Sequence, residues 1–329
     1  MKKWIKRLVL LAGLAAVAVP AGLVWYGNQP LELEGLPKTI HVPPGSHLRS
    51  LSTSLEREGV IRSARTFWLL GRMFGKQDTL KVGVYTIDRP LTPLELYAKI
   101  QRGEVSQAVV QFIEGWSWRE VRAALARQPL LKNDSGSMSD AEVMQAIGAE
   151  AVHPEGMLFP DTYFYAPHSS DLLVLRRAYR LQQEKLADAW QTRAPGLPYR
   201  TPYEALVMAS IIEKETGAAF ERPMIAGVFV NRLRKRMRLQ TDPTVIYGLG
   251  ERFDGNLRKV DLQTDTPYNT YTRSGLPPTP IAMPSEAAIR AALNPARTRA
   301  LYFVSRGDGT HVFSDDLAAH NRAVNRYQR

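Results

Sequence analysis

The sequence contains no cysteine among its 329 residues, which excludes disulfide bonds, thiolate metal sites and cysteine nucleophiles. It also lacks the signatures of several large enzyme classes, namely HExxH, GxxxxGK, GxGxxG after a strand and the GxSxG nucleophile elbow. The six histidines are scattered, and only His311 and His320 share one predicted strand and helix unit. Because no further metal ligands accompany them, we interpret the histidines as structural or surface residues and expect neither a metal nor a cofactor.

Long hydrophobic runs are absent except near the N-terminus, where residues 8–27 form an uncharged run of 20 residues, about the length that crosses a bilayer. Cations precede this run and acids follow it: Lys2, Lys3, Lys6 and Arg7, then Glu32 and Glu34. This asymmetry predicts a single-pass membrane anchor with a cytoplasmic N-terminus and an extracytoplasmic body. The alternative is a cleavable signal peptide ending near Ala18, although Trp25 and Tyr26 suit the far membrane interface.

Acidic residues are in deficit, since 43 lysines and arginines face 32 aspartates and glutamates for a net charge of +11. The densest basic cluster, residues 232–238, surrounds most of a helical cylinder and is typical of a solvated face. A nucleic-acid binder is one hypothesis for this charge, but a body that faces out of the cytoplasm meets little nucleic acid, so we expect none as a partner. Anionic lipid head groups and the carboxylates of cell-wall peptides are the counter-charges that we expect.

The order of the predicted elements indicates an α+β fold. A strand, a glycine turn and a helix start occur twice, around Gly45 and Gly115. The first copy has the order β-α-α-β and resembles the small LysM module that binds N-acetylglucosamine-containing glycans; a purely structural spacer is the alternative. We predict a cytoplasmic stub and transmembrane helix at 1–27, a linker at 28–38, a LysM-like unit at 39–104, a second small α/β unit with a connector at 105–150, and a lysozyme-like α+β catalytic domain at 151–329.

One predicted helix carries a carboxylate onto its apolar face. Residues 201–204 form a capping box with proline at the first helical position, so the start of the helix is well fixed. At about 100° per residue, Met208, Ile212 and Glu215 share one face, whereas Glu213 lies toward its edge. Apolar surroundings would raise the pKa of Glu215 and let it act as a general acid near neutral pH. The alternative is that Glu215 reaches solvent or pairs with an arginine.

Three irregular segments carry aromatic residues that could face a substrate. Proline and glycine prevent a regular helix at 153–165, where sugar rings could stack on aromatic faces and Glu155 and Asp161 could bind hydroxyl groups. Core packing under a loop is the alternative for this segment. Residues 239–250 and 264–284 lack periodicity yet hold several tyrosines, which is typical of a functional loop system.

Four motifs, in order along the chain, resemble the endolytic murein transglycosylase family, also called MltG or YceG-like. They are SIIEKET at 210–216, NRLxxxMRLQTDPTVIYG at 231–248, YNTYxxxGLPP at 268–278 and HxFSxxLAxHN at 311–321. The resemblance implies an inner-membrane lyase that cuts peptidoglycan glycan strands internally and leaves 1,6-anhydro-N-acetylmuramic acid ends. It also implies that cutting nascent strands limits their elongation.

The resemblance also implies which residues act. Many lytic transglycosylases carry a catalytic glutamate followed by serine at the end of an apolar helix, and Glu215 with Thr216 is similar to that pair. Glu215 is therefore the predicted catalytic acid, and Glu213 is not. Resemblance and composition together nominate six groove residues: Gln240, Asp242, Tyr247, Tyr268, Asn269 and Tyr271.

The predicted partners are peptidoglycan glycan strands and, through residues 8–27, the inner membrane; a peptidoglycan synthase is a further candidate partner. Two alternative functions stay open. In one, the chain is a non-catalytic peptidoglycan-binding scaffold and Glu215 is structural. In the other, it is a muramidase-type hydrolase that uses water and a second acid, Asp242 or Glu155.

Overall fold

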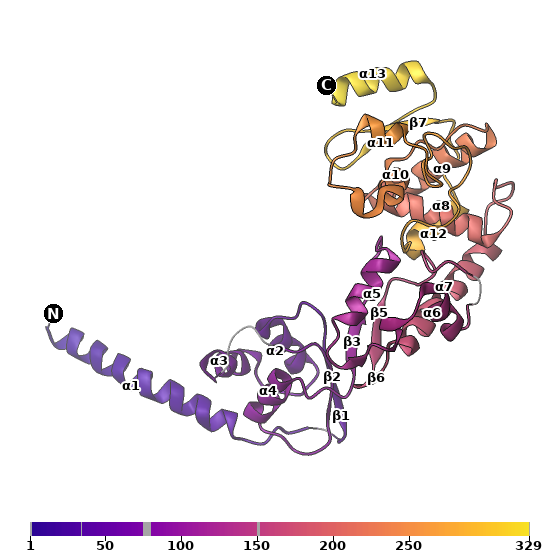
Figure 1. Ribbon diagram of the computed structural model, residues 1–329. Coiled ribbons are helices and arrows are strands. Elements are labelled where there is room, and N and C mark those ends of the chain that lie inside the picture. Colours follow the sequence, from indigo (N-terminus) through magenta and orange to yellow (C-terminus); the bar gives the residue numbers. More distant parts are fainter. Residues whose placement is uncertain (1, 34, 75–79, 150–151, 329) are drawn as a thin grey trace. The chain divides into compact units, whose positions relative to one another are not determined.

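The structure is a computed structural model that describes residues 2–33, 35–74, 80–149 and 152–328. It shows a mixed α+β fold, mostly helical, with short two-stranded sheets (Figure 1), so the predicted α+β class is confirmed. The chain divides into two compact units, Met1–Val109 with Phe164–His168 and Val110–Tyr163 with Ser169–Arg329. The predicted boundary at 150 and 151 falls outside the described residues.

Helix α1 (Lys2–Gly27) contains the whole of the predicted anchor at 8–27. The side chains of residues 5–13 and 15 are outside the described part of the chain. Among the helices that are described, none has both the length and the apolar character that crossing a bilayer requires. At its end, α1 packs closely on α3 and α4, because a Cβ added to Gly27 would lie 2.9 Å from side-chain carbons of Leu70 and Leu94.

The first unit has the predicted order β-α-α-β. Strand β1 (Lys38–Val42) pairs antiparallel with β2 (Gly83–Ile87), with Ile40 opposite Tyr85. Both side chains are buried, because alternate residues of each strand face the helices. The helices of this unit are α2 (Leu48–Arg57), α3 (Ala64–Phe74) and α4 (Pro93–Arg102).

The second unit begins with short elements around one long helix. One sheet of this unit is β4 (Leu131–Lys132) parallel to β6 (Ser169–Ser170). Strand β3 (Ala108–Gln111) pairs with β5 (Thr162–Tyr165), and both strands belong to this unit only in part, because the division at 109 and at 163 falls within them. Its first helices are α5 (Trp118–Ala126), η1 (Asp134–Ser137), α6 (Asp140–Ile147) and α7 (Asp171–Gln191). Asp171 is fully buried and accepts hydrogen bonds from the Ser135 backbone and hydroxyl, which ties the start of α7 to η1.

The remainder of this unit surrounds α8 (Pro202–Glu215). The elements that follow are η2 (Ala219–Glu221), α9 (Arg222–Arg234), α10 (Asp242–Leu249), η3 (Gly250–Arg252), α11 (Lys259–Gln263), α12 (Glu286–Leu293), β7 (Tyr302–Ser305), β8 (His311–Ser314) and α13 (Leu317–Tyr327). Strands β7 and β8 pair antiparallel. Helices α7, α9, α10 and α12 all contact α8.

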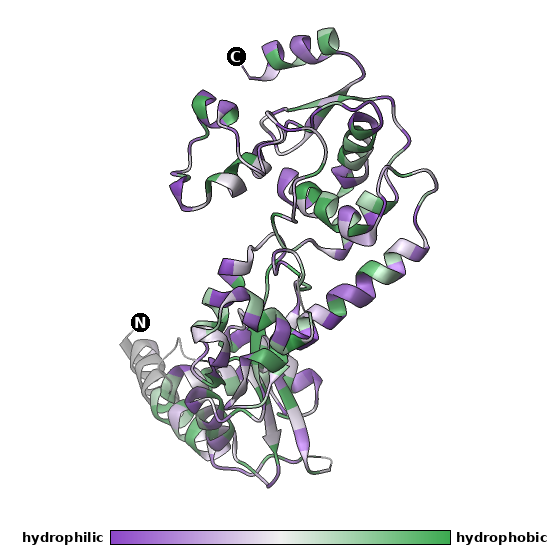
Figure 2. Cartoon of the chain, turned by 45° about the vertical axis from the view of Figure 1, so that its right-hand side comes forward, coloured by the Kyte–Doolittle hydropathy of each residue, from purple (hydrophilic) through white to green (hydrophobic). Residues whose placement is uncertain are grey.

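Helix α8 begins where the sequence predicts, with the Thr201 hydroxyl accepting a hydrogen bond from the Glu204 backbone amide at 3.2 Å. The prediction of one buried face is too narrow, because every residue from 205 to 212 is buried. Four helices enclose α8, so the side that the pattern leaves polar is covered as well. Figure 2 shows the contrast between α7, which alternates in hydropathy, and the largely hydrophobic α8. The buried Ser210 hydroxyl is satisfied by donating to Val207 O and accepting from the Ile281 amide.

Candidate active site

Glu215 is the last residue of α8, and its partly buried carboxyl lines a cavity of about 530 Å³. We call this space the Glu215 cavity. Its walls come from α9, the segment after it, β7, β8 and α13, and include Arg232, Leu239, Gln240, Asp242, Tyr271, Tyr302, His311, His320 and Asn321. The surroundings combine polar groups with aromatic rings, as a sugar site requires.

The environment of Glu215 suits a proton donor. Burial raises the pKa of its carboxyl to about 7, and the nearby Asp242 acts in the same direction. A hydrogen bond from the Thr241 hydroxyl to Glu215 Oε1 opposes this rise, as do the charges of His311 and Arg232. The balance leaves Glu215 able to give and take a proton near neutral pH.

Glu213 is engaged differently, although it is only two residues away. Its Oε1 accepts a hydrogen bond from Arg222 at 3.0 Å, and both side chains of this ion pair are largely buried. Its Oε2 accepts from the backbone and hydroxyl of Ser285, the N-cap of α12. Glu213 therefore fastens α8 to α9 and α12, and the arginine contact that was an alternative for Glu215 belongs to Glu213.

Three of the predicted groove residues line the Glu215 cavity: Gln240, Asp242 and Tyr271. The Tyr271 hydroxyl donates to Asp242 Oδ1 at 2.6 Å, so these two side chains form one polar unit on the cavity wall. Gln240 has a φ of 50°, a conformation that costs a non-glycine residue free energy, and its backbone amide donates to Thr270 O at 3.2 Å. The chain is thus held in a strained turn next to the acid.

Tyr247 and Tyr268 line a different cavity, of about 870 Å³, together with Trp118 and Glu155. We call it the Glu155 cavity. The two tyrosine rings meet edge to face, 4.8 Å apart. Helix α10 contributes to both cavities: Asp242 lines the Glu215 cavity, and its neighbour Pro243 lines the Glu155 cavity.

Glu155 is the second carboxyl with a strongly shifted pKa. It is 3% exposed, and burial raises its pKa to about 7 despite hydrogen bonds that favour the ionised form. The Trp118 backbone amide donates to its Oε1 at 2.9 Å, and the Tyr247 hydroxyl donates to its Oε2 at 3.1 Å. Glu155 therefore joins the start of α5 to α10.

The structure places Asn269 inside its own loop. The residue is fully buried, and its amide nitrogen donates to the carbonyls of Asp261, Leu262 and Thr264. Its Oδ1 accepts from the Tyr271 backbone amide at 2.8 Å. Asn269 thus shapes the loop that presents Tyr271.

Arg232 lies at the Glu215 cavity, although the sequence places it in a solvated basic cluster. That prediction is wrong for this residue, which is 8% exposed. Its Nε donates to Leu301 O at 2.6 Å and its Nη1 to Leu239 O at 2.8 Å, while the guanidinium lies 5.1 Å from the Tyr302 ring centre. Its burial is compensated by one carbonyl of the turn that follows α9 and by one carbonyl 69 residues away in the chain, and a helical pattern shows neither partner.

His311 and Glu221 are also missed by composition and periodicity. His311 lines the Glu215 cavity, and its Nδ1 lies 2.7 Å from Glu221 Oε2. The HxFSxxLAxHN spacing was the available signal, since it also brings His320, stacked on Tyr302 at 5.1 Å, to this cavity. In the described part of the chain, no group of three or more histidines and acids is placed to hold a metal ion.

Comparison with known proteins agrees with this geometry. The sequence pattern of the YceG-like family matches residues 40–326. The chain is 32% identical over 327 residues to the endolytic murein transglycosylase of Bacillus subtilis (strain 168), covering 93% of this chain and 90% of that protein. It is 26% identical to the endolytic murein transglycosylase of Streptococcus pneumoniae serotype 2 (strain D39 / NCTC 7466), where 87% of this chain covers 57% of the relative.

A solved structure is similar over most of the chain. It is a 2.6 Å crystal structure of a yceG-like protein from Listeria monocytogenes, with 32% sequence identity and a TM-score of 0.60. The similarity covers 87% of this chain and 98% of that one. The family match, the relatives and this structure lead to one conclusion: the chain belongs to the YceG-like family.

Proposed function

We propose that this chain is an endolytic murein transglycosylase, a lyase that cuts the glycan strands of peptidoglycan without using water. Membership of the YceG-like family and the two relatives of that name support the activity. The observation that carries the proposal is the position of Glu215. It places one carboxyl with a pKa of about 7 at the end of a buried helix, in the wall of a cavity.

Glu215 performs two proton transfers in turn. In its protonated form it donates to the oxygen of the β-1,4 bond that follows N-acetylmuramic acid, and the C1–oxygen bond breaks. In its ionised form it accepts the proton of the C6 hydroxyl of the same sugar while that oxygen bonds to C1. The carboxyl ends as it began, and the product has a 1,6-anhydro end. A retaining hydrolase would need a second carboxylate as its nucleophile, and this route does not.

The residues around Glu215 position the sugar. Thr241 donates to Oε1 and so fixes the orientation of the carboxyl. Asp242 and Tyr271 offer a joined acceptor and hydroxyl for sugar hydroxyl groups, and Gln240 offers an amide for the acetamido group. Tyr247, Tyr268 and Asn269 contribute less directly, through the adjoining cavity and the loop fold.

The experiment that tests the activity reads the new chain ends. We expect purified protein, incubated with isolated glycan strands, to release fragments with 1,6-anhydro ends, detected by mass spectrometry. Heat-inactivated protein is the control. Binding to strands without any cleavage would leave the scaffold function and contradict the proposal.

A muramidase-type hydrolase is the second candidate, because Asp242 lines the same cavity as Glu215 and could serve as the second acid. Its products would carry reducing ends, heavier by two hydrogens and one oxygen. Cleavage in isotopically labelled water separates the two reactions, since a hydrolase introduces the label at C1 and a transglycosylase does not.

The finer organisation belongs to the same proposal. We propose that residues 8–27 anchor the chain in the inner membrane with the body in the periplasm, that 39–104 is a LysM-like unit, and that 151–329 is a lysozyme-like catalytic domain. The charge asymmetry around the hydrophobic run supports the orientation, and cleavage of nascent strands there would limit their elongation. The test is a fusion of the C-terminus to a reporter that is active only in the cytoplasm. Activity of this reporter would contradict the placement.

A further inference from the structure

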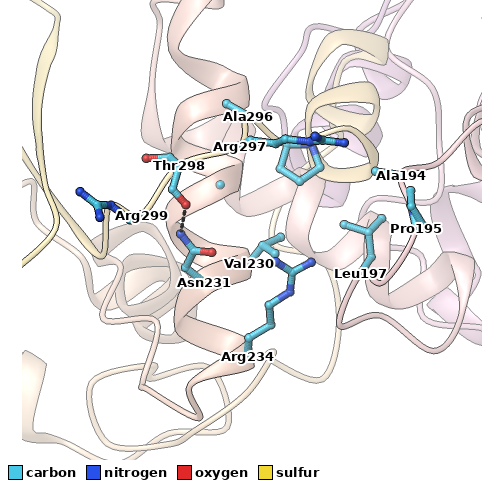
Figure 3. Close-up of a pocket in the computed structure, with 12 residues that line it drawn as sticks. Ala194, Pro195, Leu197, Val230, Asn231, Arg234, Ala296, Arg297, Thr298 and Arg299 are labelled. Carbon is cyan, nitrogen blue, oxygen red and sulfur yellow. Dashed lines mark hydrogen bonds between the residues drawn. The ribbon is translucent and has the colours of Figure 1, made fainter.

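A third cavity of the second unit, of about 690 Å³, is lined by α9 and by the segment that follows α12 (Figure 3). We call it the arginine cavity, because Arg234, Arg297 and Arg299 lie among its lining residues. The α9 residues that line it include Gly227, Asn231 and Arg234. Arg232, which lines the Glu215 cavity, lies roughly 150° round the helix from that stripe, so α9 presents a different face to each cavity.

The charge of the arginine cavity is not neutralised from within. Among the described residues that line it, three are arginines and none is an aspartate or glutamate. Arg234 donates to Gly196 O at 2.8 Å and keeps its charge. Arg299 lies 3.4 Å from Asp315, but both side chains are exposed, so this pair is weak in water. Figure 3 shows Arg299 pointing away from Arg234, which extends toward Leu197 and Val230.

The wall that carries Arg297 is fixed in place. The Asn231 amide donates to Thr298 O at 2.9 Å and to Ala300 O at 3.1 Å, which fastens the segment along α9. Gly227 permits this close approach, because a Cβ there would lie 2.7 Å from Ala296 O. A cationic wall that is already ordered loses little entropy when it binds an anion.

The lining of the cavity and its distance from the Glu215 cavity indicate which anion fits. Besides the arginines, most of the lining is apolar: Ala194, Pro195, Leu197, Val230, Pro295 and Ala296. Such a site suits a carboxylate that carries methyl groups. Arg299 lines the arginine cavity and Tyr302 lines the Glu215 cavity, and the three residue steps between them limit the separation of their Cα atoms to about 10 Å. An extended peptide of four residues covers about 13 Å.

We propose that the arginine cavity binds the carboxylates of the peptide stems that the glycan strand carries, so that strands with stems are cut in preference to bare strands. The inference rests on the proposed function, because a sugar held in the Glu215 cavity brings its stem within reach. The ligand is an acidic, alanine-containing peptide, and Arg234 and Arg297 are the residues that recognise it.

The test compares strands that carry stems with strands from which an amidase has removed them. We expect the double variant Arg234→Gln, Arg297→Gln to lose about tenfold in kcat/KM on strands with stems, since charge-assisted hydrogen bonds are lost, and to cut bare strands like the wild type. Lys235→Gln removes a charge from the exposed neighbour of Arg234 and is the matched control. Equal losses on both substrates, or no loss on strands with stems, would overturn the inference.

Two further measurements separate this site from the proposed activity and from lipid. Calorimetric titration of the full chain with a free stem tetrapeptide measures binding at the arginine cavity without any cleavage. If the protein binds the tetrapeptide but cuts neither kind of strand, only the proposed function is contradicted. Binding to vesicles that contain phosphatidylglycerol is the second. If the double variant loses vesicle binding but keeps its preference for strands with stems, the cavity serves lipid phosphates and the inference is wrong.

A separate observation concerns His311, which a buried carboxylate holds in the Glu215 cavity. Glu221 is 5% exposed, and its two oxygens accept from the His311 backbone amide at 2.9 Å and face Nδ1 at 2.7 Å. The ring also packs edge-on against Phe303 at 5.4 Å. Because the carboxylate requires a donor, Nδ1 carries a proton, and this contact leaves Nε2 as the ring nitrogen that can meet a second partner.

We infer that His311 contacts the substrate and positions a sugar hydroxyl beside Glu215 through Nε2, with Glu221 as the positioning residue behind it. His311→Asn keeps a donor where Nδ1 lies and loses Nε2, whereas His311→Gln places its amide where Nε2 lies. We expect His311→Asn to lose about 10²-fold in kcat with little change in KM, because the hydroxyl is no longer aligned, and His311→Gln to retain more activity.

Stability measurements keep this inference testable. The pair also joins η2 to β8, so thermal melts of each variant are needed, and His47→Asn on the exposed surface of the first unit is the control. We expect added imidazole to restore part of the activity of His311→Ala. Wild-type kcat in a folded His311→Asn variant, or equal losses in the Asn and Gln variants, would overturn the assignment.

Discussion

The second unit contains two carboxyls whose pKa is raised to about 7, Glu215 and Glu155, and their surroundings differ. Glu155 accepts hydrogen bonds from α5 and α10 and is almost inaccessible, so it holds segments together. Glu215 is partly accessible, and it lines a cavity whose other residues include polar groups and aromatic rings. A raised pKa alone therefore does not identify a catalytic acid. The carboxyl must also be accessible to a substrate from a cavity.

The comparison is sharpest for glycan cleavage. We expect Glu215→Gln to lower the rate of anhydro-end formation on the order of 10⁴-fold, because one residue acts as both acid and base. Its melting temperature should change little, since the amide keeps the acceptor for Thr241. Release of anhydro-muropeptides, measured by mass spectrometry, gives the rate, and Glu184→Gln on the exposed side of α7 is the control.

Glu155 should respond in the opposite way. We expect Glu155→Ala to lower the free energy of unfolding by about 3 kcal/mol, because the Trp118 amide and the Tyr247 hydroxyl lose a buried acceptor. Per folded molecule, the cleavage rate should remain within about tenfold of the wild type, as expected for a residue outside the reaction. Urea denaturation measures the first quantity. A folded Glu155→Ala variant as inactive as Glu215→Gln would remove the distinction between the two acids.

The pH dependence separates stability from activity. Because the folded-state pKa of Glu155 is about 7 against 4.5 for the free side chain, the folded protein binds the extra proton between these values. Protonation of Glu155 therefore adds about 3 kcal/mol to the free energy of unfolding below pH 4.5, and this contribution is lost as the pH rises to about 7. We expect Glu155→Gln to flatten this fall in denaturation curves.

Activity should follow the other acid. The cleavage rate of the wild type should fall above about pH 7 as Glu215 loses its proton, and Glu155→Gln should leave this limb in place. If Glu155→Gln shifts the alkaline limb instead, Glu155 takes part in the reaction.

The smallest effect that we expect concerns Thr241. Its hydrogen bond lowers the pKa of Glu215, so Thr241→Val should move the alkaline limb of the pH and rate profile upward. The cleavage rate below that limb should fall by less than about tenfold, because one hydrogen bond to a charged group is lost. Thr244→Val, which removes a hydroxyl that donates to Thr241 O, serves as a nearby comparison and should not move the limb.

What the sequence predicts well is local. The start of α8 at Thr201 and Pro202, its end at Glu215 and the burial of its apolar residues follow from capping and periodicity, which depend on neighbours in the chain. The prediction that Glu213 and Glu215 have different surroundings is confirmed, but the burial of Glu213 depends on Arg222 and Ser285, which the helical pattern does not show. Gln240, Asp242 and Tyr271 meet at one cavity because the turn after α9 and the loop at 270 both end beside α8.

What the sequence does not predict depends on distant contacts. Arg232 is buried because carbonyls of Leu239 and Leu301 reach it, and neither partner is visible in a helical pattern. Tyr247 faces the Glu155 cavity rather than Glu215 because it shares one face of α10 with Pro243 and Ile246, whereas Asp242 lies off that face. Composition alone treats all such tyrosines as equivalent.

The enclosure of α8 has a consequence for how this protein tolerates change. An ordinary surface helix accepts substitutions on its solvent-exposed face, so tolerant and intolerant positions alternate with the helical period. Here each side chain from 205 to 212 is buried. A bulkier replacement would overpack the core, and a smaller one would leave a cavity. The helix that carries the proton donor is therefore expected to tolerate few substitutions along its whole length from 205 to 212.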